Sequence, residues 1–191
     1  SPDLDAHFAE YARWMKATLG LPADALHIDV GCNDGLLLEK SRGEGFRGEG
    51  VDPSPAADRA AAKGFEIHKC FLSADIVAAK RLAAKADVIT CNNMMANIRE
   101  LLAFGRTIFD MLKPGGYLIV ETLHFPMLVR NLVFEMINHE HYHYFSVSSI
   151  GRFFERLGLQ LVSCERTATK GANMRCLARK PTPDEMGKLE A

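Results

Sequence analysis

The sequence predicts an α/β fold in which a doubly wound, mostly parallel sheet is completed by a C-terminal antiparallel hairpin. Two observations carry this prediction. Short apolar runs alternate with alanine-rich or helically periodic segments between residues 26 and 122, and parallel strands need helical crossovers of this kind. Farther on, the β-like runs LQLVSCERT and NMRCLARK are separated only by a short turn region, which is typical of a hairpin.

The composition favours one globular domain. The chain has 191 residues, of which 48% are hydrophobic and 25% charged, and its net charge of -1 offers no basic patch for nucleic acid or an anionic membrane. No apolar run approaches the roughly 20 residues of a membrane span, the first residues lack a signal-peptide pattern, and the cysteines form no CxxC pair. We therefore expect a single domain over residues 1–180 in the reducing cytoplasm, followed by an unstructured polar tail over 181–191.

The expected elements begin with an amphipathic helix over residues 5–19, whose apolar side chains recur at helical spacing. Apolar runs then predict strands at residues 26–31, 46–52, 66–70, 86–92 and 116–122. The helix before the last of these strands is expected to end in Lys113-Pro114-Gly115-Gly116, because the two glycines stop a helix and reverse the chain. A helix over residues 146–158 and the hairpin complete the fold.

A glycine turn follows the first expected strand, in the stretch LHIDVGCNDG. A dinucleotide site needs G-x-G-x-x-G, but Asn33 stands where the second glycine belongs and the third is missing, which disfavours a nicotinamide oxidoreductase. The loop keeps Gly31 and Gly35, and Asp29 precedes the first of them by two residues. This pattern suits a ligand that lacks a pyrophosphate and carries an ammonium group, such as S-adenosylmethionine.

Asp52 stands at the end of the second expected strand, in GVDPS. A carboxylate at that place can accept hydrogen bonds from both hydroxyls of a ribose. Alternatively, Asp52 only starts the turn before Pro53, a role that aspartate also fills well.

Four motifs in order, IDVGCNDG, GVDPS, TCNNMM and LKPGGYLIVE, resemble the class I S-adenosylmethionine-dependent methyltransferases over about residues 26–122. The resemblance implies a Rossmann-like sheet of the class I type and S-adenosylmethionine as cofactor. It places Asp29 near the cofactor's amino group and Phe71 beside adenine, although Phe71 would also suit simple core packing. The residues that it places around the methionine part and the sulfonium are Gly31, Cys32, Asn33, Gly35, Asn92 and Asn93.

The segment FEMINHEHYHYFS, residues 134–146, holds three of the seven histidines. If it is extended, its two faces carry His139, His141 and His143 on one side and Glu140, Tyr142 and Tyr144 on the other. Ligands two residues apart on a straight strand seldom converge on zinc or iron, so no metal is expected. A polar rim and general acid–base chemistry are the remaining interpretations.

The same segment, with SVSSIGRFFERLGLQLV after it, is similar to the sugar C-methyltransferases that act on nucleotide-linked keto-deoxysugars. The resemblance implies His141 as the base that removes a proton beside the sugar ketone, with Glu140 next to it as a polariser or substrate ligand. Asn138 replaces an aromatic residue of that family, and because the sequence has no CxxC pair we expect no counterpart of the family's cysteine-rich zinc domain. Arg175 is either a ligand for an anionic or carbonyl group or a surface residue.

The sequence therefore predicts a methyltransferase that acts on a small molecule, by carbon methylation through an enolate. Oxygen methylation is the alternative, with His141 or His139 as the base that deprotonates a hydroxyl. A non-catalytic S-adenosylmethionine-binding module is the alternative from another class. Neither nucleic acid nor a membrane is expected as a partner, and the sequence leaves the oligomeric state open.

Overall fold

The computed structural model describes residues 2–167 and 172–189. Its sheet has the strand order β3-β2-β1-β4-β5-β7-β6. The pairs from β3 to β5 are parallel, and β7 is antiparallel to both β5 and β6, so the predicted fold class is confirmed. The strands are β1 Leu26–Val30, β2 Arg47–Val51, β3 Glu66–His68, β4 Ala86–Asn92, β5 Leu112–Leu123, β6 Gln160–Thr167 and β7 Asn173–Arg179.

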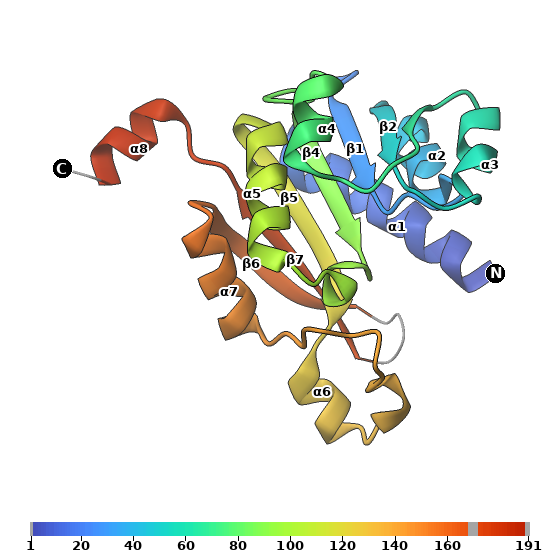
Figure 1. Cartoon of the computed structure of the whole chain (residues 1–191), viewed down its shortest axis with the longest axis vertical. Helices are drawn as coiled ribbons and strands as arrows, with labels where there is room; N and C mark the ends of the chain where they lie inside the picture. The colour runs from blue at the N-terminus through green and yellow to red at the C-terminus, as the bar shows by residue number, and fades with distance from the viewer. Residues whose placement is uncertain (1, 168–171, 190–191) are drawn as a thin grey trace.

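Helices cover both faces of the sheet (Figure 1). Side chains of α4, α5 and α7 join the apolar cluster on one face, and those of α1 and α2 join the cluster on the other. The helices are α1 Pro2–Leu19, α2 Leu36–Gly43, α3 Ala57–Ala62, α4 Ala74–Ala79, α5 Leu101–Met111, α6 Phe125–Arg130, α7 Val147–Arg156 and α8 Pro183–Leu189, with 3-10 turns η1 Met95–Asn97 and η2 Phe134–Met136. No helix in this described part is both long enough and apolar enough to cross a membrane.

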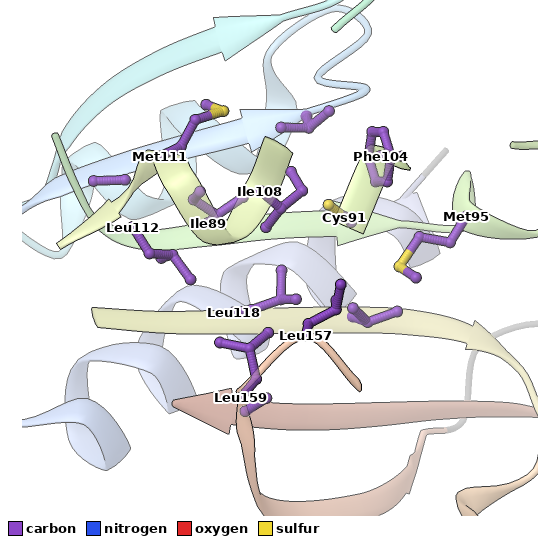
Figure 2. Packing of buried hydrophobic residues seen from close by; sticks show 14 of the residues in the cluster. Ile89, Cys91, Met95, Phe104, Ile108, Met111, Leu112, Leu118, Leu157 and Leu159 are labelled. Atoms are coloured by element: carbon purple, nitrogen blue, oxygen red, sulfur yellow. The ribbon is translucent and has the colours of Figure 1, made fainter. Parts of the chain in front are cut away.

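The larger core lies between α5 and strands β4 and β5. Figure 2 shows Phe104, Ile108 and Met111 of α5 above Ile89 and Cys91 of β4. These α5 residues recur every three or four positions, so one side of the helix is buried along its length. This core thereby holds β4 and β5 in fixed positions relative to each other.

The carboxyl ends of the parallel strands meet at one edge. Val30 pairs with Val51 on one side and with Cys91 on the other, so β1, β2 and β4 end at nearly the same level. The helix α6 and the segment after it lie beyond the arrowheads of these strands in Figure 1. Open parallel sheets bind ligands at this edge.

Two boundaries differ from the sequence expectation. The helix expected to end in Lys113-Pro114-Gly115-Gly116 ends at Met111, because a residue before proline disfavours the helical conformation. Within the expected polar tail the chain forms α8 instead of remaining unstructured. Glu185 of α8 accepts hydrogen bonds from Thr182 and pairs with Arg179 at 2.9 Å, which holds the start of the helix against β7.

Gly35, at the start of α2, is a position where the fold requires glycine. Its φ is +73°, and an added Cβ would lie 2.7 Å from Cβ of Ala60. We expect Gly35→Ala to lower the free energy of unfolding by about 2–4 kcal/mol, through backbone strain and overpacking together. Gly64→Ala is the matched control, since its φ is +84° but nothing lies within 4 Å of its added Cβ. Urea denaturation measures both variants, and equal losses would contradict the role of close packing.

Candidate functional site

A pocket of about 790 Å³ lies at the carboxyl edge of the sheet, beside β1, β2 and α5. Of the residues predicted to bind a cofactor, four line it: Gly31, Asn33, Asp52 and Phe71. Sequence reasoning missed several others, among them Pro53, Ser54, Leu72, Met94, Ile98 and Phe104. Pro53, Ser54 and Met94 lie within three residues of the end of a strand, so their place in the chain was the signal that could have identified them.

The loop after β1 turns through left-handed backbone conformations. Gly31 has φ of +81° and its N–H donates to the carbonyl of Val51 at 2.8 Å. Asn33 has φ of +51°, and asparagine is among the few residues other than glycine that adopt this conformation readily. The asparagine in place of a second glycine therefore keeps the turn while adding a side chain at the pocket.

Asp52 ties the ends of β1 and β2 together. Its Oδ2 accepts a hydrogen bond from the amide of Asn33 and its Oδ1 one from the amide of Ser54, both at 2.8 Å. The second of these bonds is the turn-starting role considered above. Each carboxylate oxygen has two lone pairs, so both oxygens keep an acceptor site for a ligand hydroxyl.

Three of the predicted residues lie behind the loop and do not line the pocket. Asp29 is 4% exposed, and burial raises its pKa to about 7, with the Thr90 hydrogen bond opposing this rise and the Asp52 carboxylate adding to it. The side chain of Cys32 packs in an apolar cluster, and burial first, then nearby carboxylates, raise its pKa to about 12. Cys32 is thus a neutral packing thiol, and Gly35 precedes α2 beneath it.

Phe71 is 81% exposed and borders the pocket. The alternative that it packs in the core is therefore wrong. An aromatic ring at a pocket rim offers an apolar face for a planar ligand group.

Asn92 and Asn93 do not line the pocket. They link the end of β4 to α1 and β7 by hydrogen bonds. The hydroxyl of Tyr11 in α1 donates to Oδ1 of Asn92 at 3.2 Å, while Nδ2 of Asn92 is buried with no hydrogen-bond partner among the described residues. Asn93 has φ of +52° and accepts a hydrogen bond from Nδ2 of Asn173 in β7 at 2.9 Å. One donor at this strand end is thus left for a further group.

Arg175 is neither a surface residue nor open to a ligand. It is 2% exposed, its Nε lies 3.4 Å from a carboxylate oxygen of Glu121, and its guanidinium stands 4.0 Å above the Tyr11 ring. His7 also pairs with Glu121, at 3.0 Å. Arg175 thus links α1 to β5 and β7. Its place in the hairpin did not reveal these partners, so the sequence did not predict that its side chain is buried.

The histidine-rich segment is not extended, so the predicted alternation of its faces is wrong. It contains η2 and further turns, in which the amide of His141 bonds to the carbonyl of Asn138. Two successive amides, of Tyr142 and His143, donate to the carbonyl of Ala96. These local turns fold the segment back on itself, leave His139 and Glu140 exposed, and half-bury His141.

The ring of His141 has a defined orientation. Its Nδ1 lies 3.1 Å from the carbonyl oxygen of Met136, and its ring meets that of Tyr144 edge-on at 5.7 Å. A carbonyl can only accept, so Nδ1 carries the proton and Nε2 of the neutral ring carries the basic lone pair. This tautomer is the one a general base acting through Nε2 requires.

Sequence reasoning overlooked His124, which follows β5, and did not separate His143 from its neighbours. Nδ1 of His124 and Nε2 of His143 are buried with no hydrogen-bond partner among the described residues. Burial, and then the positive charge of Arg166, lowers the pKa of His124. His124 directly follows β5, and this position at the carboxyl end of a strand could have marked it as a candidate site residue in the sequence.

Comparison with known proteins identifies the family. The sequence pattern described as "Methyltransferase domain" matches residues 5–164, which is most of the chain. The chain belongs to this methyltransferase family. The resemblance inferred from the four motifs is therefore confirmed.

Two curated relatives of this chain differ in the methylated atom that their names imply. The C-methyltransferase NovU of Streptomyces niveus is 28% identical over 170 residues, which are 87% of this chain and 40% of NovU. The ubiquinone biosynthesis O-methyltransferase of Ralstonia nicotianae is 29% identical over 119 residues, which are 58% of this chain and 48% of that enzyme. The chain thus spans less than half the length of these relatives.

A solved methyltransferase has the same fold. The 1,6-didemethyltoxoflavin-N1-methyltransferase of Burkholderia thailandensis, crystallised with 1,6-didemethyltoxoflavin and S-adenosylhomocysteine, superimposes with a TM-score of 0.70. The two are 16% identical, and the match covers 93% of this chain and 79% of the other. At this identity the likeness concerns the architecture only.

One cluster of potential metal ligands lies away from the pocket described above. Glu49, Glu66 and His68 each offer one ligand atom, and these atoms lie within 4.8 Å of one another. Both oxygens of the buried Glu49 carboxylate are already paired, with Lys85 at 2.9 Å and Arg47 at 3.1 Å. The cluster is therefore a charge-paired network between β2 and β3.

Proposed function

We propose that this chain is an S-adenosylmethionine-dependent methyltransferase that methylates a carbon beside the carbonyl group of a small molecule, such as a keto-sugar. The observation that carries the cofactor part is the pocket at the β1 and β2 ends, where Asp52 keeps free lone pairs beside a left-handed loop. The relative named as a C-methyltransferase supports the choice of carbon.

The residues around the pocket fit the cofactor group by group. Asp52 would accept the ribose hydroxyls, and the exposed ring of Phe71 would cover adenine. The backbone of Gly31 and Asn33 would line the methionine part, with the carboxylate of Asp29 behind it for the ammonium group. The orphaned Nδ2 of Asn92 would donate to the cofactor carboxylate, with Asn93 supporting that strand end.

S-adenosylmethionine supplies a methyl group made electrophilic by a sulfonium. His141 takes the proton from the carbon next to the acceptor's carbonyl through Nε2, and the electron pair of the broken C–H bond remains on the acceptor as an enolate. Glu140 stands beside it to polarise or bind the acceptor. The enolate carbon would then bond to the methyl carbon, while the methyl–sulfur bond breaks and its electron pair stays on the sulfur of the departing S-adenosylhomocysteine. The protein would mainly position the acceptor and stabilise the enolate.

Oxygen methylation is the second candidate, favoured by the relative named as an O-methyltransferase. In that case His141, or the exposed His139, removes a proton from a hydroxyl instead. The two reactions differ in a measurable way, because only the carbon route exchanges the acceptor's α-hydrogen with solvent.

Mass spectrometry in deuterated water tests this proposal. Nucleotide-linked keto-sugars and simple ketones are incubated with the protein and S-adenosylmethionine. A methylated product together with deuterium in unreacted acceptor is the expected result. A methylated product without deuterium in the unreacted acceptor would contradict carbon methylation and indicate methylation of an oxygen. Cofactor binding without methylation of any acceptor would overturn the keto-sugar proposal and favour a binding module.

Replacing His141 with glutamine is expected to lower kcat by about 10²–10⁴-fold, the usual contribution of a general base. Binding of S-adenosylhomocysteine, measured by calorimetry, should stay unchanged. His139→Gln is the matched control, because its exposed ring lies two residues away and should leave kcat nearly unaffected. If His139→Gln lost activity and His141→Gln kept it, the base would be misassigned.

A further inference from the structure

A series of hydrogen-bonded, buried polar side chains connects α2 with Asp29, next to the loop after β1. It lies on the face of the sheet that α1 and α2 cover. The Oγ of Ser41 lies 2.8 Å from Nδ1 of His27, and Nε2 of His27 lies 2.7 Å from Oγ1 of Thr90. Thr90 in turn lies 2.6 Å from Oδ1 of Asp29. His27, Ser41 and Thr90 are 0% exposed, so the hydrogen bonds of this chain have little competition from solvent.

With Asp29 ionised, the chain can run in one direction only. A carboxylate accepts and never donates, so the Thr90 hydroxyl must donate to Asp29. Oγ1 of Thr90 then accepts from His27, which places the histidine proton on Nε2. Nδ1 of His27 accepts from the Ser41 hydroxyl, and every bond of the chain points toward the anion.

With Asp29 protonated, the same atoms can form the opposite chain. Asp29 donates to Thr90, Thr90 donates to Nε2 of His27, and the histidine proton moves to Nδ1. Nδ1–H then donates to Ser41, whose own hydroxyl is free to donate to the carbonyl of Leu38, 3.1 Å away. The Ser41 contact with Leu38 gives the reversed chain a terminal acceptor, so both directions leave the inner groups satisfied.

We propose that Asp29, Thr90, His27 and Ser41 form a reversible hydrogen-bond relay that responds to the cofactor's ammonium group. When this group makes Asp29 an anion, one proton leaves the relay to solvent, and the proton of His27 passes from Nδ1 to Nε2. The inference rests on the proposed binding of S-adenosylmethionine at this loop. Thr90 and His27 are positioning residues in this relay, since they act on the cofactor only through Asp29. The relay lets a buried acid stay neutral when the loop is empty and become a hydrogen-bonded anion when a cation arrives.

The groups around Asp29 support the neutral form of the empty site. The charged group that acts on Asp29 is Asp52, and Asp29 in turn raises the pKa of Tyr11, Cys32 and Cys91; none of these four groups is a cation. The pKa of Asp29 is raised to about 7, chiefly by burial, so the acid is largely protonated at pH 6 and largely ionised at pH 8.5. Burial lowers the pKa of His27 to about 3, so its two forms are both neutral tautomers.

Nitrogen NMR tests the relay on the whole protein labelled with ¹⁵N, with the His27 ring signals assigned by comparison with His27→Gln. At pH 6 without ligand we expect His27 to carry its proton on Nδ1, and with saturating S-adenosylhomocysteine on Nε2. Adenosine, which lacks the ammonium group, should leave the Nδ1 tautomer in place. An unchanged tautomer, while calorimetry shows S-adenosylhomocysteine bound, would overturn the relay.

Two further measurements separate failure of the relay from failure of the proposed function. If S-adenosylhomocysteine did not bind, the cofactor proposal would fail, and the ligand-free protein would still test the relay by comparing pH 6 with pH 8.5. The same His27 tautomer at both pH values would then reject it. In the isosteric variant Thr90→Val, the tautomer should no longer respond to S-adenosylhomocysteine, and its Kd should rise roughly tenfold. A response that persisted in Thr90→Val would show that Thr90 does not connect the two groups.

Discussion

Replacing Arg175 with alanine is expected to lower the free energy of unfolding by about 3–5 kcal/mol, the usual cost of removing one partner from a buried ion pair. Arg175 and Glu121 are 2% and 1% exposed, and their side chains lie 3.4 Å apart. Without the guanidinium, the Glu121 carboxylate keeps His7 as its principal partner and remains buried. The variant also loses the contacts with the rings of Tyr11 and Trp14, at 4.0 Å and 4.8 Å. Urea denaturation measures the loss.

Two control variants separate charge from packing at this position. Arg175→Met keeps most of the side-chain volume, so its loss of stability should come mainly from the lost charge pair between Arg175 and Glu121. The double variant Arg175→Met with Glu121→Gln removes both charges and should recover much of the stability. If the double variant were no more stable than Arg175→Met, the ion pair would not be the source of the effect.

Replacing Asp52 with alanine is expected to raise the Kd for S-adenosylhomocysteine by about 100-fold. Hydrogen bonds to a charged group contribute about 1.5–3 kcal/mol each, and the variant loses the proposed bonds to the ribose. It also releases the amide of Asn33, which the carboxylate holds at 2.8 Å, so the loop after β1 loses a fixed contact. Isothermal titration calorimetry measures the change.

Two control variants show how much of the rise in Kd comes from the Asp52 carboxylate itself. Asp52→Asn retains one acceptor oxygen and the side-chain shape, so its Kd should rise by only about tenfold. Asp58→Ala removes a neighbouring exposed carboxylate that pairs with Lys69, and it should leave the Kd unchanged. Binding by Asp52→Ala within a factor of about two of the original protein would show that the ribose lies elsewhere.

The architecture, and the place of Gly31, Asn33 and Asp52 at the pocket, could be predicted because local patterns determine them. Apolar runs with helical segments between them specify parallel strands, and each motif at a strand end reaches the same edge once the strands are parallel. Gly31, Asn33 and Asp52 are close in sequence to their strands, so their positions at the pocket followed from secondary structure. Asn33 has a left-handed φ, which asparagine adopts readily, so the turn forms even though asparagine stands in place of the second glycine of the dinucleotide motif.

What the sequence by itself determined was therefore the fold class, the family and the loop residues of the pocket. Only the tertiary structure decided which polar side chains face one another, because those partners come from elements far apart in the chain. Arg175 meets Glu121 and α1 in the interior, and His27 meets Ser41 and Thr90 through side chains that no periodicity pairs. The histidine segment folds into turns because its amides bond to Ala96 of η1, a partner that local pattern could not reveal.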